Sequence, residues 1–285
     1  MKILVTGSEG QLGRSIQQRI SDYPEFIFEF TDIDQLDITD KSDLEAYLKS
    51  NKPDAIINCA AYTAVDKAEN DSEKAFLLNA TAVEYLAQLA LENKILLIHI
   101  STDFIFNGKS KRPYIEEDIG LAESIYGKSK LAGEKAIINC RPNAFIIRTS
   151  WLYSEYGHNF VKTILRLAAE REELKIVSDQ VGTPTYAGDL ADAILNILNS
   201  NYRPEGIQIF HYSNEGVVSW YDFAKAIVEI DNLDCRIIPI TTTEYPLPAK
   251  RPAYSVMSKQ KFKQTFRLYI PEWKESLITC LKNLS

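Results

Sequence analysis

A tyrosine and a lysine four residues apart are the side chains of this sequence best suited to proton transfer. Tyr126 and Lys130 have the i, i+4 spacing that places two side chains on one helix face. An ammonium beside a phenol lowers the phenol's pKa from about 10, so that the tyrosine can give or take a proton near neutral pH. The spacing alone is weak support, because Tyr221 and Lys225 repeat it on a late helix. We interpret that second pair as a packing face.

The residues that precede Tyr126 distinguish the Tyr126–Lys130 pair from the Tyr221–Lys225 pair. A strand-like run ends at Ser101 and Thr102, upstream of Tyr126. Ligands of doubly wound sheets bind beyond the carboxyl ends of the strands, so Thr102 and Tyr126 can meet on one substrate oxygen. We therefore predict Thr102, Tyr126 and Lys130 as a catalytic trio.

A glycine-rich turn after the first strand predicts a dinucleotide site. Gly7, Gly10 and Gly13 lie between that strand and the first helix, where backbone N–H groups can approach a pyrophosphate. Their GxxGxxG spacing departs from the commoner GxGxxG. We expect the loop to bind NADH or NADPH.

The residue that would bind the adenosine ribose should follow about 20 residues later. Asp32 fits, 19 residues after Gly13, with Asp34 and Asp37 as near competitors. No lysine or arginine occurs between Arg19 and Lys41, which favours NADH weakly and leaves NADPH open.

The elements that must hold these residues alternate in the first 150 positions. The strand-like runs are Lys2–Thr6, Phe26–Thr31, Asp54–Asn58, Ile95–Ser101 and Asn143–Thr149. The helical stretches between them are Gln11–Ile20, Ser42–Lys49, Ser72–Glu92 and Tyr126–Ile138. Continuous apolar strands separated by helices predict an α/β fold with a doubly wound parallel sheet of the Rossmann type.

The alternation loosens after Arg148, and prolines gather late in the chain. The expected elements there are a helix at Asn159–Glu172, a strand at Leu174–Ser178, a helix at Ala187–Leu198, a strand at Gln208–Tyr212 and a helix after Pro271. We predict a nucleotide-binding domain over residues 1–150, to which segments near 174–212 return. The predicted smaller α/β substrate lobe covers residues 151–173 and 213–285.

Composition excludes several other classes. The net charge of −7 argues against a nucleic-acid binder, which would carry a basic stripe. The four cysteines and three histidines are scattered, which predicts neither disulfides nor a metal site. No apolar run approaches the roughly 20 residues of a membrane helix, and a strand begins at Lys2, so we expect a cytoplasmic protein without a signal peptide.

Together these motifs resemble the extended short-chain dehydrogenases/reductases, and within them the dTDP-4-dehydrorhamnose reductases. The wider resemblance rests on the glycine loop, Asn58–Thr63, Ser101–Gly108 and Tyr126–Lys130; the narrower one rests on Leu36–Asp40, Ala61–Asp66, Arg148–Tyr153, Asp179–Thr185 and Arg251–Pro252. It implies reduction, by NADPH or NADH, of the C4 ketone of a dTDP-4-keto-6-deoxysugar.

The resemblance also implies roles by position. It places Asp103 in the pocket of the catalytic trio. Three groups of residues would contact the cofactor. They are Gly7, Gly10, Gln11 and Leu12 at the pyrophosphate, Asp37 and Ile38 at the adenosine, and Ala60, Ala61 and Tyr62 at the nicotinamide half. The residues it turns toward the substrate are Thr63, Val65, Phe104, Trp151, Asn159 and Arg251.

Two positions depart from the family pattern. Phe104 stands where a tyrosine is usual, which puts one substrate contact in doubt. Some members bridge a homodimer with magnesium through a glutamate, and Ser15 occupies that position here. We therefore expect no metal requirement, while a homodimer stays open.

Two other functions fit the same trio. One is a sugar-nucleotide epimerase, which would retain its cofactor tightly. The other is a non-enzymatic subunit like the regulatory subunit of methionine adenosyltransferase, against which an intact trio argues.

Overall fold

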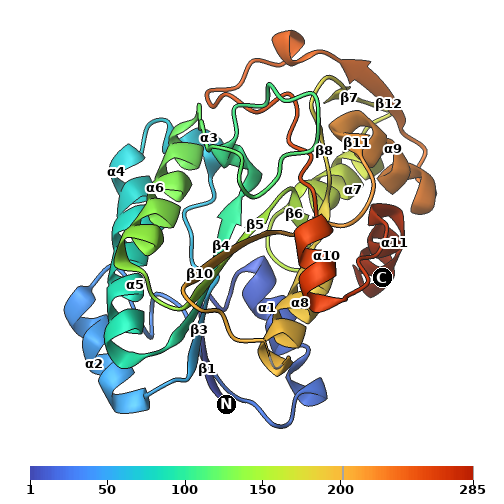
Figure 1. Ribbon diagram of the computed structural model, residues 1–285. Helices are drawn as coiled ribbons and strands as arrows, with labels where there is room; N and C mark the ends of the chain where they lie inside the picture. Colours follow the sequence, from blue (N-terminus) through green and yellow to red (C-terminus); the bar gives the residue numbers. More distant parts are fainter. Residues whose placement is uncertain (201, 285) are drawn as a thin grey trace.

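The computed structural model describes residues 1–200 and 202–284, and a parallel sheet forms its centre (Figure 1). The six strands are β1 (Lys2–Thr6), β2 (Ile27–Thr31), β3 (Ala55–Asn58), β4 (Leu96–Thr102), β5 (Ala144–Thr149) and β10 (Ile207–His211). Their order is β10-β5-β4-β3-β1-β2, and every neighbouring pair is parallel. The predicted doubly wound α/β sheet is confirmed.

Helices cover both faces of this sheet because the strands are apolar on both sides. On one face Ile3 and Val5 pack with α1 (Gln11–Gln17), α8 (Ala187–Asn199) and α10 (Gln260–Phe266). On the other face Leu4 packs with α2 (Lys41–Asn51), α5 (Ala82–Asn93) and α6 (Ile125–Cys140). The sequence pattern did not predict α10.

The predicted helix over 72–92 is divided in the structure. It consists of α4 (Ser72–Phe76), a π-helical turn (Leu77–Thr81) and α5, and α3 (Val65–Ala68) precedes it. Such π-helical turns are rare and often occur at functional sites. The buried Asn79 lies in this turn.

The second lobe lies beyond the sheet, in the upper right of Figure 1. It contains α7 (Phe160–Glu170), β7 (Glu173–Val177), α9 (Trp220–Ile230), β12 (Arg236–Ile240) and α11 (Trp273–Leu284). A cluster of buried apolar side chains from these elements forms its own core.

The segment 174–212 is shared between the two parts. α8 packs on α1, and β10 pairs with β5 in the large sheet. β7 differs, because it pairs with β12 and lies in the second lobe. Sequence reasoning did not anticipate β12, whose Pro239 interrupts the strand pattern.

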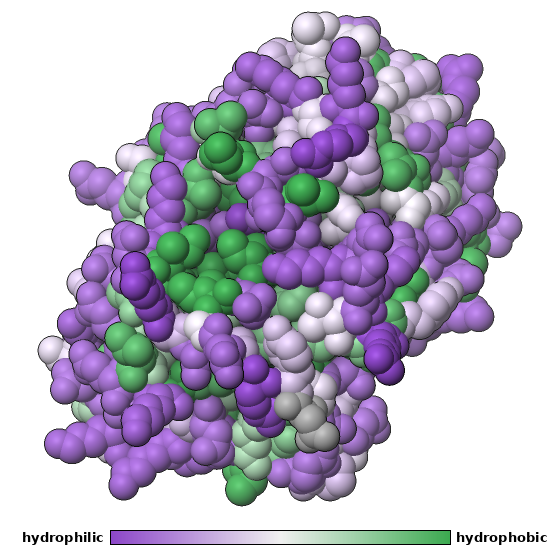
Figure 2. Space-filling model, viewed as in Figure 1, coloured by the Kyte–Doolittle hydropathy of each residue, from purple (hydrophilic) through white to green (hydrophobic). Residues whose placement is uncertain are grey.

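Two short strand pairs lie where the chain passes between the large sheet and the second lobe. β6 (Leu152–Tyr153) pairs with β9 (Thr185–Tyr186), and β8 (Val181–Gly182) pairs with β11 (Val218–Ser219). The face in Figure 2 is mostly polar, with an apolar area near its middle. Within residues 1–200 and 202–284, no helix has the length and apolarity needed to cross a membrane.

Candidate functional site

A cleft of about 630 Å³ opens at the carboxyl ends of β1, β3, β4 and β5. It lies between the large sheet and the second lobe. Most of the predicted site residues line it, namely Gly7, Gly10, Gln11, Leu12, Ala61, Thr63, Val65, Thr102, Asp103, Phe104, Tyr126, Lys130, Trp151, Asn159 and Arg251. The predicted residues outside its lining are Gly13, Asp32, Asp37, Ile38, Ala60 and Tyr62.

The glycine loop forms one wall of the cleft. Gly7 has φ +65°, and a Cβ there would lie 2.5 Å from the Ala60 nitrogen, so the β1 turn and the loop after β3 approach too closely for a side chain. Gly10 is different, because a Cβ there would meet only the Gly7 carbonyl oxygen, at 3.2 Å. Gly10 therefore leaves open space at the start of α1, where no side chain caps the helix.

Asp32 and Asp37, two of the three candidate ribose-binding carboxylates, each accept a hydrogen bond from a backbone N–H. Asp32 accepts the Glu9 N–H at 2.9 Å, which ties the end of β2 to the glycine loop. Asp37 uses one carboxylate oxygen, Oδ1, to accept the N–H and hydroxyl of Thr39. The cation beside the loop, Arg14, forms an exposed ion pair with Glu9 at 2.5 Å.

Gln11 links the glycine loop to the second lobe. Its Oε1 accepts hydrogen bonds from the Asn159 amide and the Ser154 hydroxyl, both at 3.0 Å. Asn159 also caps α7 by accepting the Lys162 N–H. Sequence reasoning placed Gln11 at the cofactor and Asn159 at the substrate, and the structure joins the two residues directly.

The position of α6 brings Tyr126 to the cleft. Ser124 caps the helix by accepting the Gly127 N–H at 3.1 Å. A Cβ on Gly127 would lie 2.2 Å from the Phe104 carbonyl oxygen, so glycine lets α6 approach the end of β4. The Tyr126 ring consequently packs edge-to-face on Phe104, with ring centroids 5.5 Å apart.

The protonation of Tyr126 differs from our expectation. We expected Lys130 to lower its pKa, but burial raises the pKa of Tyr126 to about 12, which the Thr102 hydroxyl partly offsets. The Lys130 ammonium is directed elsewhere, since it donates to the Ile100 carbonyl oxygen at 2.6 Å. Burial lowers the pKa of Lys130 itself to about 8.

Asp103 has an unused oxygen in this pocket. Its Oδ1 accepts from the Thr102 hydroxyl at 3.1 Å, whereas Oδ2 is buried without a hydrogen-bond partner. Burial raises the pKa of Asp103 to about 6. The Ser255 hydroxyl is also buried without a hydrogen bond, and it lies close enough to Asp103 to lower the pKa of this carboxyl, so Ser255 is one group that could donate to Oδ2.

Sequence reasoning missed Asn79, which joins two walls of the site. Its amide accepts the Tyr62 N–H at 2.8 Å and donates to the Tyr62 carbonyl at 3.0 Å. It also donates to the Ser129 hydroxyl at 2.9 Å on α6. Only the contacts of the folded chain reveal this role of Asn79, because an asparagine inside a helical sequence pattern does not by itself indicate a site.

The residues predicted to face a substrate come from both parts of the protein. Trp151 stacks on Trp220, with ring centroids 3.5 Å apart. Arg251 forms a bidentate ion pair with Asp66 at 2.6 and 2.9 Å, which joins the second lobe to α3. The pKa of Asp66 is lowered by this arginine.

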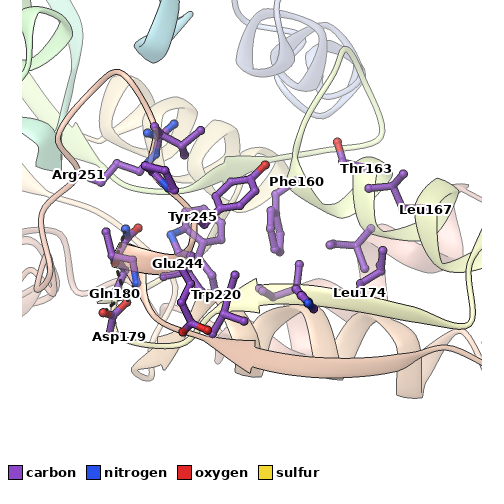
Figure 3. Close-up of a pocket in the computed structure, with 18 of the residues that line it drawn as sticks. Phe160, Thr163, Leu167, Leu174, Asp179, Gln180, Trp220, Glu244, Tyr245 and Arg251 are labelled. Atoms are coloured by element: carbon purple, nitrogen blue, oxygen red, sulfur yellow. Dashed lines mark hydrogen bonds between the residues drawn. The ribbon is translucent and has the colours of Figure 1, made fainter.

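A second cavity of about 1190 Å³ continues from the cleft into the second lobe (Figure 3). The two share five lining residues, which are His158, Asn159, Phe160, Trp220 and Arg251. Figure 3 shows Phe160, Trp220 and Tyr245 around this space.

The second tyrosine–lysine pair lies outside the cleft. Lys225 is exposed on α9, where its ammonium is 3.7 Å from the Glu229 carboxylate. Our interpretation of a packing face is therefore wrong for Lys225, because i, i+4 spacing also suits a solvated helix surface.

Chelation should leave activity unchanged. Within the described ranges, no group of three or more His, Cys, Asp or Glu side chains could hold a metal ion. The buried Ser15 hydroxyl instead donates to the Gln11 carbonyl at 2.9 Å. Turnover measured with and without EDTA checks this, and a loss that magnesium restores would contradict it.

Comparisons with known proteins agree on one family. The family model described as the RmlD substrate binding domain matches residues 1–285. A dTDP-4-dehydrorhamnose reductase of Aggregatibacter actinomycetemcomitans is 40% identical, covering 97% of each chain. Among solved structures, a dTDP-4-dehydrorhamnose reductase of Clostridium acetobutylicum is 42% identical with TM-score 0.95, covering 100% of this chain and 99% of that one. The Bacillus anthracis enzyme in complex with NADP is 36% identical with TM-score 0.94, covering 99% of each chain.

Proposed function

Because this chain belongs to the RmlD substrate binding domain family, we propose that it reduces dTDP-4-dehydro-L-rhamnose to dTDP-L-rhamnose with NADPH or NADH. The observation that carries the proposal is the meeting of Thr102, Tyr126 and Lys130 with the glycine loop in one cleft. Reduction of the C4 ketone adds a hydride to the carbon and a proton to the oxygen. Thr102, Tyr126 and Lys130 suit the transfer of the proton to the oxygen.

The glycine loop fits a dinucleotide. The open space at Gly10 and the uncapped start of α1 suit a diphosphate. We assign the cofactor contacts to Gly7, Gly10, Gln11, Leu12, Gly13, Asp32, Asp37, Ile38, Ala60, Ala61, Tyr62, Tyr126 and Lys130. A bound nicotinamide would supply the hydride.

Tyr126 is the proposed proton donor. Burial keeps its phenol protonated at neutral pH, since its pKa is raised to about 12. Thr102 lies beside it, and its hydroxyl would turn from Asp103 Oδ1 to donate a hydrogen bond to the same substrate oxygen. Asp103 Oδ2, which has no hydrogen bond, would accept a sugar hydroxyl. The Lys130 ammonium lines the same cleft, and although it donates to the Ile100 carbonyl oxygen it would stabilise, through its positive charge, the phenolate that remains after the proton leaves.

The second cavity suits the nucleotide half of the substrate. It continues from the cleft, is bordered by Phe160, Trp220 and Tyr245, and has Arg251 at the junction. We propose that the base lies among these aromatic rings. Arg251 would pair with the diphosphate, because a guanidinium matches phosphate oxygens well.

Arg251→Ala should raise KM about tenfold or more with a smaller change in kcat, because hydrogen bonds to charged groups contribute about 1.5–3 kcal/mol. Arg236→Ala is the matched control, since that arginine pairs with Glu173 on an exposed surface outside both cavities. Steady-state kinetics with the keto-sugar nucleotide measure both. An unchanged KM for Arg251→Ala would remove this residue from the diphosphate site.

One assay tests the overall proposal. Purified protein is mixed with a dTDP-4-keto-6-deoxysugar and either NADH or NADPH, and cofactor oxidation and product stereochemistry are measured. We expect turnover to the 6-deoxy-L-sugar. Tight cofactor retention with epimerised product would favour an epimerase. Cofactor binding without any reduction would favour a regulatory subunit.

We propose that the reaction takes place in the cytoplasm. Cys59, Cys140, Cys235 and Cys280 are all free thiols, which suits a reducing compartment.

A further inference from the structure

His99 contacts the proposed catalytic lysine but has no role in the chemistry described above. It lies on β4 and is fully buried. Its Nε2 is 3.5 Å from the Lys130 Nζ, and its Nδ1 is 3.1 Å from the Asn58 amide nitrogen. The ring thus lies between a buried amide and the amine of the active-site helix.

Hydrogen bonds on the far side of Asn58 determine which ring nitrogen carries the proton. The Ala60 backbone N–H donates to Asn58 Oδ1 at 3.2 Å, and the Thr6 hydroxyl donates to the same oxygen at 2.8 Å. A backbone N–H can only donate, so the Asn58 side-chain atom that faces Ala60 and Thr6 must be the amide oxygen. The Asn58 NH₂ must then donate to His99 Nδ1.

His99 consequently turns an N–H toward Lys130. Burial, and then the Lys130 charge, lower the pKa of His99 well below its ordinary value, so the ring is neutral. A neutral imidazole has one N–H, and with Nδ1 accepting, that N–H is on Nε2. An ammonium at Lys130 can only donate hydrogen bonds, so it could not accept one from the His99 Nε2–H. A neutral Lys130 amine has a lone pair and could accept that hydrogen bond.

We propose that His99 is a positioning residue whose Nε2–H, held toward Lys130 by Asn58, favours the neutral amine over the ammonium. Its kinetic consequence rests on the function proposed above. His99 would limit the ammonium to the lower part of the working pH range and so set the alkaline limit of turnover.

The other groups around Lys130 do not replace this role. Glu134 favours the ammonium, but its carboxylate is shared with the buried Arg148 at 2.8 Å and with the Ser101 hydroxyl. The Ile100 carbonyl oxygen accepts from Nζ in either protonation state. The titratable groups that interact with Lys130 are Cys59 after β3, His99 on β4 and Glu134 on α6. Asp103 and Tyr126 line the same cleft.

His211 provides a contrast within the same protein. It is also fully buried, and its Nδ1 lies 3.2 Å from the Tyr114 carbonyl oxygen, which can only accept. Its Nε2 lies 3.3 Å from an Arg148 nitrogen, which can only donate. His211 must therefore carry its proton on Nδ1, the opposite tautomer to His99.

The tautomers can be read from imidazole ¹⁵N signals of the unsubstituted protein without substrate. We expect one buried histidine with the Nε2–H pattern and one with the Nδ1–H pattern, assigned with His99→Leu. A His99 ring that is charged at pH 7, or that carries its proton on Nδ1, would overturn the proposal. This measurement does not depend on any enzymatic activity.

The effect on Lys130 is measured by titrating its ¹³Cε signal, assigned with Lys130→Met. In His99→Leu we expect the midpoint to rise by about half a pH unit or more, because the opposing N–H is gone while burial is kept. Asn58→Asp is a second variant, because its carboxylate can still accept from Ala60 and Thr6 while moving the His99 proton to Nδ1. It should raise the midpoint as well.

Kinetics then separate positioning from structure. The alkaline limb of kcat should move up with the Lys130 midpoint in both variants. A uniform loss of kcat with an unmoved limb, and a ¹³Cε midpoint equal to that of the unsubstituted protein, would show that His99 only packs. If the protein reduces no keto-sugar, the proposed function fails, and the two NMR measurements still decide the role of His99.

Discussion

Tyr126→Phe should lower kcat by about two orders of magnitude or more, because positioned acid catalysis is typically worth about 10²–10⁴-fold. Hydride addition to a ketone leaves an alkoxide that needs a proton, and the buried Tyr126 phenol is protonated at neutral pH. The substitution removes only the hydroxyl and keeps the ring that packs on Phe104. Cofactor affinity and thermal unfolding should therefore stay near those of the unsubstituted protein.

Tyr221→Phe is the matched control for this result. It belongs to the other i, i+4 tyrosine–lysine pair, which lies on α9 outside the cleft. It should change neither kcat nor cofactor affinity. If Tyr126→Phe kept full activity, the proton donor would have to be another group, and Asp103 is the first alternative because burial raises its pKa to about 6.

Local patterns were sufficient to predict the sheet, the glycine loop and the three residues Thr102, Tyr126 and Lys130, whereas the other predicted residues of the cleft followed only from the family resemblance. The glycine loop follows a buried strand directly, and Tyr126 and Lys130 lie one helical turn apart, so both features depend on neighbours in the sequence. Parallel strands then bring their carboxyl ends to one edge, which is why Thr102 and Tyr126 line the same cleft. Identical spacing at Lys225 gave a surface ion pair, so spacing alone does not identify a site.

Contacts between distant segments could not be predicted. β12 pairs with β7 across 63 residues, as in the register of Arg236 with Glu173, and no local pattern announces that pairing. The spacing of Asp32 predicts a ribose ligand, but no local pattern shows that its carboxylate also accepts the Glu9 backbone N–H. The bond between Gln11 and Asn159 spans 148 residues and exists only because the second lobe folds back over the glycine loop.

Lys130→Met should remove most activity, by roughly 10²-fold, because a buried positive charge in the pocket where negative charge develops is typically worth this much. Lys130 is 2% exposed, and its ammonium would stabilise the Tyr126 phenolate as it forms, besides contacting the cofactor ribose. Methionine has a similar length and no charge, so the fold should persist, which thermal unfolding checks. Lys225→Met is the control, and it should leave catalysis unchanged because that side chain is exposed on α9.

Lys130→Met should also change how kcat depends on pH. Burial lowers the pKa of Lys130 to about 8, so its ammonium is present below that pH and is lost as the pH rises through it. The unsubstituted protein should therefore lose kcat as pH rises through that range. Lys130→Met should lack this limb, because methionine has no proton to lose. A variant that turned over at the normal rate, with the alkaline limb in its original place, would show that Lys130 neither stabilises the phenolate nor sets the pH limit of the reaction.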